Sequence, residues 1–116
     1  MTVENYIKAQ LAELAWKTAH QSGHNTTVAI ALAVANRVRE RYQGNWLEAF
    51  NEAQIPAGQH PDPRDPEFQR LLAEIDTIYD GGQDVLTNGA LWFIKDATLP
   101  IMGERTAELG GFTFYK

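Results

Sequence analysis

The chain of 116 residues contains no cysteine, which excludes disulfide bonds and thiolate chemistry. It also lacks an excess of positive charge, because 15 acidic residues outnumber 10 basic ones and the net charge is -5. This balance opposes attraction to nucleic acid polymers and to anionic membranes. Long apolar runs are missing from the amino end, where every such run is interrupted by Glu4, Lys8, Glu13 or Lys17. We therefore expect no signal peptide, no membrane span and synthesis in the cytoplasm.

The overall composition is that of an ordinary globular protein, with 44% hydrophobic and 22% charged residues. A chain of this length can bury one core without metal or disulfide staples. We expect a single domain over residues 1–116.

Two helices are predicted in the first 42 residues. Apolar residues recur at helical spacing between residues 3 and 19, namely Val3, Ile7, Leu11, Leu14 and Ala15. After a break at 21–25, a second helix runs to about Tyr42, with Asn25, Thr26 or Thr27 as its N-cap. The alternation of apolar residues from Val28 to Val34 could equally mark a strand, but the intervening alanines favour a helix. Because this helix is apolar all round, we expect it at the centre of the fold.

Capping residues and prolines mark the next elements. Asn45 is expected to cap a short helix that carries Trp46, Phe50 and Ala53 on one side. Prolines at 56, 61, 63 and 66 predict a surface loop over residues 55–66. Asp65 as N-cap and Pro66 at the first helical position open an amphipathic helix that ends at Gly81-Gly82. Its apolar stripe comprises Phe68, Leu71, Leu72, Ile75, Ile78 and Tyr79.

The carboxy-terminal part changes to residues that favour strands, at 91–95 and 112–115, separated by a turn-rich stretch with Pro100 and Gly103. These segments predict an antiparallel pair packed on the helices. The expected fold class is α+β, mainly α: a helical domain with a small C-terminal antiparallel β-hairpin.

The order of these segments resembles the cell wall hydrolase family of the spore-cortex-lytic enzyme type, which is itself similar to lysozyme-like enzymes. The resemblance covers roughly residues 11–115. It rests on an alanine-rich helix ending in Asn36-Arg37-Val38, a Pro-rich loop, an amphipathic helix, the Gly89-Ala90-Leu91-Trp92-Phe93 segment and a final strand closing in Phe114-Tyr115.

The resemblance implies a glutamic acid that protonates the leaving oxygen of a glycosidic bond in peptidoglycan. Counting back from Asn36, and holding Ala19 against the family's alanine, places that acid at Thr18. A hydroxyl cannot serve as the acid, and losing a general acid costs about 10² to 10⁴ in rate. The family's closing strand also carries a histidine, where this chain has Phe112.

Few residues could replace the missing acid. Glu13 lies roughly 140° around the helix from Thr18 and is expected to point elsewhere. His20 and His24 follow Thr18 in the turn, and histidine can donate a proton near neutral pH. Both could equally be exposed turn residues without a role.

Other candidate ligand contacts lie further along the chain. Asn36 is a polar amide on a buried helix and must find a partner. Arg37 could contact a ligand or satisfy carbonyl groups at the helix end. Gly89 and Ala90 would let a ligand approach the backbone, and Trp92 could stack on a sugar or belong to the core. Metal ligation is not expected, because the three histidines lack carboxylates at ligand spacing, and no cofactor motif appears.

Two hypotheses follow for the function. In the first, the domain has lost catalysis and binds or sequesters a glycan fragment or another small polar ligand such as a nucleotide, through Thr18, His20, Asn36, Arg37, Gly89, Ala90, Trp92 and Phe112. In the second, it is an active peptidoglycan hydrolase or lytic transglycosylase with His20 as a substitute donor, reaching the wall through lysis or a separate export route. Exposed Trp and Phe side chains could equally form a homo-oligomer surface.

Overall fold

The computed structural model describes residues 2–52, 56, 58–96 and 103–116. Its helical part consists of α1 (Val3–Ala19), the 3-10 turn η1 (His20–Ser22), α2 (His24–Arg41), α3 (Trp46–Glu52) and α4 (Pro66–Tyr79). Three strands follow: β1 (Trp92–Lys95), β2 (Arg105–Leu109) and β3 (Phe112–Tyr115). The expected fold class, α+β and mainly α, is confirmed.

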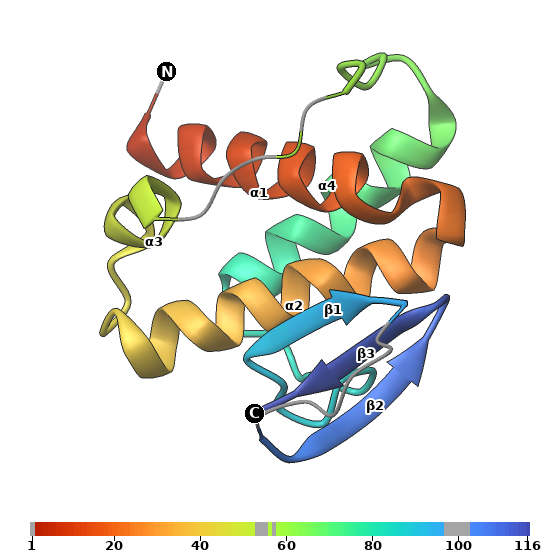
Figure 1. The fold of residues 1–116 in the computed structure, drawn as a ribbon. Coiled ribbons are helices and arrows are strands. Elements are labelled where there is room, and N and C mark those ends of the chain that lie inside the picture. The colour runs from red at the N-terminus through yellow and green to blue at the C-terminus, as the bar shows by residue number, and fades with distance from the viewer. Residues whose placement is uncertain (1, 53–55, 57, 97–102) are drawn as a thin grey trace.

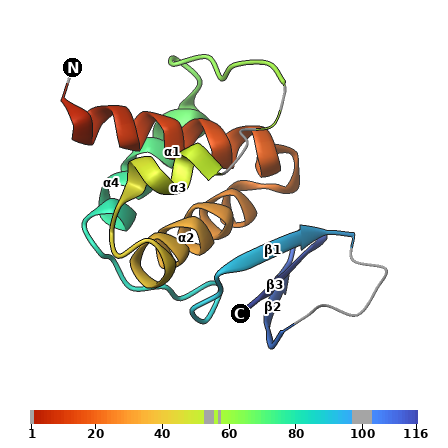
Figure 2. The same cartoon turned by 60° about the vertical axis from the view of Figure 1, so that its left-hand side comes forward.

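Helix α2 lies between the other helices and the sheet, as Figures 1 and 2 show from two directions. Helices α1 and α4 pack against it and against each other, and β1 contacts its opposite side. Every residue of α2 from Thr26 to Asn36 is buried, as expected for a helix whose residues 28–35 are all apolar. Fully buried side chains on the neighbouring helices, such as Leu11 and Ile75, each contribute about 1.5–3 kcal/mol to folding.

The helix ends follow local capping chemistry. Asp65 accepts a hydrogen bond from the Glu67 amide (2.9 Å) and Pro66 opens α4, both as predicted. Asn45 caps α3 through the Glu48 amide at 3.1 Å, also as predicted. The expectation that Val3 joins the buried stripe of α1 is wrong, because Val3 lies in the first turn and is 62% exposed. The predicted place of Ala53 lies outside the described residues.

The predicted cap of α2 also needs correction. The residue that precedes the helix is Gly23, whose φ of +102° suits glycine and lets the chain turn sharply. Helix α2 therefore begins at His24, earlier than predicted. Thr26 and Thr27 do not cap it, because their hydroxyls donate to the carbonyls of Ser22 and Gly23 (3.1 and 2.9 Å).

The sheet has the strand order β1-β3-β2 and is antiparallel throughout. The predicted pairing of the two strand segments is confirmed, with Trp92 opposite Tyr115 and Lys95 opposite Phe112. The predicted two-stranded hairpin was incomplete, because β2 forms the hairpin with β3 and carries a register shift between Arg105 and Ala107. The part of the turn-rich stretch around Pro100 lies outside the described residues.

The β2–β3 turn packs closely on α2. Gly110 has a φ of +58°, and a Cβ at that position would lie 2.2 Å from Thr26 Oγ1. Only glycine allows this approach, so the turn fixes the sheet against the first part of α2.

Candidate functional site

Thr18, the residue that the resemblance aligns with the family's acid, lies in the last turn of α1. Its side chain is half-buried, and its hydroxyl donates to the Leu14 carbonyl at 2.6 Å. Thr18 lines neither of the two cavities that border His20 and Trp16. The hydroxyl is therefore committed to its own helix.

His20 is exposed and lies two residues further on, at the start of η1. Its Nδ1 is 2.8 Å from the Trp16 carbonyl. Because a carbonyl only accepts, Nδ1 carries the proton in this contact and Nε2 is left as an acceptor in the neutral ring. The imidazole also stacks on the Trp16 indole, with ring centroids 4.8 Å apart and planes within 5°.

Two adjoining cavities, which we call the groove, open beside this stacked pair. The cavity next to α2 and α4 has a volume of about 330 Å³ and is lined by Trp16, His20, Gly23, His24, Thr27, Asp65, Glu67 and Leu71. The other, about 530 Å³, is lined by Trp16, Lys17, His20, Gln21, Gly58, Gln59, His60, Pro61, Asp62 and Asp65. Trp16, His20 and Asp65 belong to both, so the two cavities form one concave surface.

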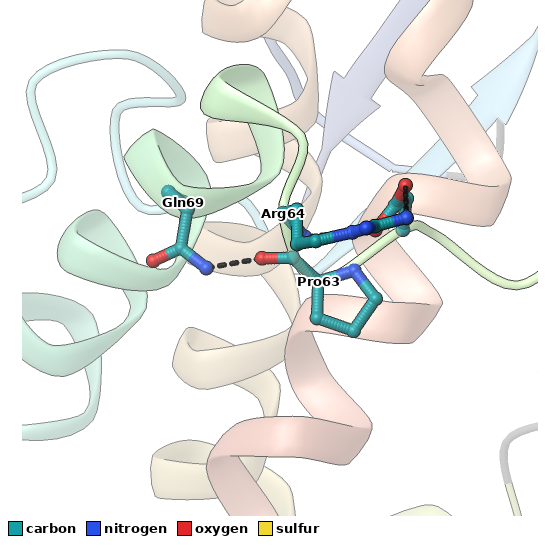
Figure 3. A network of polar contacts seen from close by, with 4 residues as sticks. Pro63, Arg64 and Gln69 are labelled. Carbon is teal, nitrogen blue, oxygen red and sulfur yellow. Dashed lines mark hydrogen bonds and ion pairs between the residues drawn. The ribbon is translucent and has the colours of Figure 1, made fainter.

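The 58–65 loop forms one wall of the groove and is bonded to α4 near one end and to α1 near the other. Figure 3 shows the Gln69 amide of α4 reaching the Pro63 carbonyl, to which it donates a hydrogen bond. Arg64 pairs with Asp62 (Nε to Oδ1, 3.4 Å). The hydrogen bond from the Arg64 backbone amide, and next the bond from its side chain, lower the pKa of Asp62. Near α1, His60 Nδ1 lies 2.7 Å from a Glu13 carboxylate oxygen.

Glu13 links this loop to α1. The same carboxylate oxygen is 2.7 Å from Lys17 Nζ, whose side chain is only 8% exposed. The hydrogen bond from Lys17 lowers the pKa of Glu13 against the opposing effect of burial. Glu13 is therefore held by Lys17 and His60.

A second group of predicted site residues meets where α2 passes the segment before β1. Asn36 donates through Nδ2 to Asp84 Oδ2 (2.9 Å) and to the Ala90 carbonyl (3.0 Å). Asp84 also accepts from the amides of Leu86, Thr87 and Gly89 (3.1, 2.8 and 3.1 Å) and from the Thr87 hydroxyl. Burial raises the pKa of Asp84, but the hydrogen bonds from Thr87, Asn36 and Gly89 outweigh it and lower the pKa. Asn36 thus has the partner that a buried amide requires.

Arg37 is bound to the strand that follows. Its Nε donates to the Leu91 carbonyl at 2.8 Å, and its guanidinium lies 4.2 Å from the centre of the Trp92 ring. The idea that Arg37 satisfies carbonyls at the end of its own helix is therefore corrected, since the acceptor belongs to another segment. Burial lowers the pKa of Arg37, but an arginine keeps its charge in proteins. This cation–π pair joins α2 to β1.

The remaining predicted residues are mainly parts of the packing. Ala90 is fully buried, and Phe112 is 3% exposed and packs edge-on against Phe93. Gly89 has a φ of +84° and lies beside the Lys116 side chain. Asn36, Arg37, Gly89, Ala90 and Trp92 are thus brought together at the α2–β1 junction, whereas His20 faces the groove at the end of α1.

Several groove residues were not proposed as ligand contacts from the sequence. Asp65, for example, is expected from the sequence only as a helix cap. No sequence signal joins the end of α1 to the 58–65 loop, which is some 40 residues away. Asp84 was also missed, although the spacing Asp84-x-x-Thr87 is typical of a side chain that hydrogen-bonds its own turn.

Within residues 2–52, 56, 58–96 and 103–116, no group of three His, Asp or Glu side chains could hold a metal ion. Over the same residues, none of the helices has the length and apolar composition needed to cross a membrane.

Comparison with known proteins gave no match to a family model, a curated protein or a solved structure.

Proposed function

We propose that this chain is a binding or sequestering protein that resembles a cell wall hydrolase without its acid and holds a glycan fragment or another small polar ligand in the groove. The observation that carries the proposal is the open cavity that Trp16 and His20 line as a stacked pair. Aromatic rings surrounded by polar side chains are the usual lining of small-ligand sites. We place this activity in the cytoplasm, where the protein is expected to be made.

The α2–β1 junction is a weaker candidate for the ligand contact. The amide nitrogen of Asn36 and the Nε of Arg37 already donate to protein acceptors. A ligand there would have to displace intramolecular hydrogen bonds, which offsets what it gains. A ligand that donates a hydrogen bond to His20 Nε2 in the groove would not have to displace an intramolecular hydrogen bond.

Titration calorimetry with soluble muropeptides tests the proposal. We expect saturable binding that Trp16→Leu weakens about tenfold, because the change removes the aromatic ring that lines both cavities of the groove. Trp46→Leu is the matched control, since Trp46 packs on Phe50 and Tyr79 and lines neither cavity. Equal affinity in the two variants would contradict the assignment to the groove.

A second candidate is an active peptidoglycan glycosidase. It is favoured by the fixed orientation of His20, whose Nε2 is available, and by the carboxylates of Asp65 and Glu67 in the same cavity. A turbidity assay on purified peptidoglycan separates the two functions. Clearing that disappears in His20→Ala would establish the enzyme, whereas clearing that appears only in Thr18→Glu would support the lost acid.

A further inference from the structure

A further cavity lies between α2 and α4, and His24 is the one residue that borders both this cavity and the groove. Its volume is about 240 Å³. The floor consists of aliphatic side chains of the two helices that are at most 7% exposed, namely Val28, Leu32 and Ile78. Small-molecule sites usually measure about 300–1,000 Å³, so this cavity suits a compact molecule rather than a sugar chain.

The segment between α4 and β1 adds an apolar wall, made by Val85 and Leu86. Val85 is 73% exposed, more than any other large hydrophobic residue in the part of the chain that the structure describes. An apolar side chain that borders a cavity and is open to water is stabilised by contact with an apolar ligand. The cavity therefore offers aliphatic contacts on its floor and on one wall.

Intramolecular bonds fix this wall in position. The Gly82 amide donates to the Thr77 carbonyl at 2.8 Å, and a Cβ at Gly82 would lie 2.6 Å from Thr77 Cγ2, so the segment packs tightly on the end of α4. Further along, the Leu86 amide donates to Asp84 Oδ1 at 3.1 Å. A ligand would thus enter a preformed cavity without the cost of ordering a loop.

Two charges of opposite sign line the cavity one turn apart on α4, Arg70 and Glu74. Across the described residues, neither side chain forms an ion pair. The equally spaced Glu13 and Lys17 on α1 do pair, at 2.7 Å. The order of the charges accounts for the difference, because an acid that precedes a base on a helix is the more favourable arrangement. Both exposed charges on α4 are therefore available to a ligand.

We propose that this cavity binds a zwitterionic α-amino acid with a branched aliphatic side chain, such as leucine. The side chain of the ligand would lie among Val28, Leu32 and Val85, with its carboxylate on Arg70 and its ammonium group on Glu74. A fatty acid would meet Glu74 with the wrong sign, and an alkylamine would meet Arg70 with the wrong sign. The inference goes beyond the proposed function, because it concerns a cavity outside the groove.

Titration of leucine into isotopically labelled protein, followed by the NMR shifts of the backbone amides, tests the inference. We expect saturable shifts around the cavity, at residues such as Leu32, Thr77 and Val85, with a Kd on the order of 1 mM for so small a ligand. Isocaproate and isoamylamine each lack one of the two charges and should bind about fivefold more weakly, the range of an exposed ion pair. Glycine lacks the aliphatic side chain and should not saturate the cavity.

Matched variants assign each contact. Val85→Ser removes an exposed apolar contact and should weaken leucine binding about fivefold. Val3→Ser makes the same change at a valine that is 62% exposed and lies outside this cavity, and it should have no effect. Arg70→Gln should abolish the preference for leucine over isoamylamine but keep the preference over isocaproate. Glu74→Gln should do the reverse.

The results separate this inference from the function proposed for the groove. Leucine that causes no saturable shifts, or shifts centred on Trp16 and His20, would overturn the inference. Isocaproate or isoamylamine that binds as tightly as leucine would overturn the recognition of a zwitterion, as would equal losses in Val85→Ser and Val3→Ser. None of these results bears on muropeptide binding in the groove, which the calorimetry of Trp16→Leu tests on its own.

Discussion

Replacing Asp84 with alanine should destabilise the domain more than any other single loss of a surface-accessible carboxylate, because Asp84 organises the segment that joins α4 to β1. Its carboxylate accepts from three backbone amides between Leu86 and Gly89, from the Thr87 hydroxyl and from Asn36. The variant leaves the Asn36 Nδ2 group with the Ala90 carbonyl as its remaining acceptor. It also removes the acceptor that shapes the turn.

The expected magnitude follows from the hydrogen bonds. Bonds to a charged acceptor contribute about 1.5–3 kcal/mol each, but several bonds to one carboxylate are not additive. Asp84 is also half-buried, so the backbone amides can turn partly to water. We expect a loss of about 3 kcal/mol in the free energy of unfolding. With an unfolding entropy of about 2.1 cal/mol/K per residue, this corresponds to a fall of about 12 °C in Tm.

Urea denaturation monitored by circular dichroism measures the change. Asp80→Ala is the matched control, since Asp80 is exposed and only four residues away, and should change stability by less than about 0.5 kcal/mol. A double-mutant cycle with Asn36→Ala should give a coupling of about 1–2 kcal/mol. A loss below about 1 kcal/mol in Asp84→Ala, or no coupling to Asn36, would refute the reasoning.

The same residue predicts a dependence on acid. The pKa of Asp84 is lowered in the folded state, so its contribution is present above the pKa of the unfolded chain, near 3.8, and is lost as pH falls toward the lower folded value. The stability of the native protein should therefore fall more steeply than that of Asp84→Ala below about pH 4. Parallel slopes in the two proteins would show that Asp84 does not carry this effect.

Three further changes test other contacts. Arg37→Lys should lower the free energy of unfolding, measured by urea denaturation, by about 1–2 kcal/mol, because lysine cannot donate to the Leu91 carbonyl while lying flat on the Trp92 ring. An unchanged free energy of unfolding would mean that the stacking contributes nothing. Gly110→Ala should lower Tm clearly, because its Cβ would collide with Thr26 at a positive φ, and an unchanged Tm would contradict the close approach. Asp65→Ala should cost about 1 kcal/mol through loss of the α4 cap, whereas Asp65→Asn should cost little; equal losses would exclude capping as the cause.

The helices could be predicted from the sequence because their signals are local. Asp65-Pro66 and Asn45 mark helix starts through bonds to amides two or three residues away. The burial of α2 followed from its composition. The start of α2 was misjudged because Thr26 and Thr27 favour capping positions, and only the conformation of Gly23 decides that their hydroxyls donate instead.

The features that the sequence did not reveal depend on distant partners. Strand β2 is short, contains alanine and glutamate, and is a strand because β3 pairs with it. The bond between Asn36 and Asp84 spans 48 residues. The groove likewise depends on the 58–65 loop lying against the end of α1, which no periodicity in the chain encodes.

The strand order places the apolar β3 in the middle of the sheet and makes β1 and β2 its edge strands. Both edge strands carry features that oppose further pairing. Strand β1 is only four residues long and ends in exposed Lys95, while β2 carries the Arg105–Glu108 ion pair (2.8 Å) and an irregular register. Charged side chains and bulges on outer strands discourage pairing with another molecule. The sheet is thereby protected from growing into an intermolecular aggregate, even though its central strand has the composition that amyloid-forming segments share.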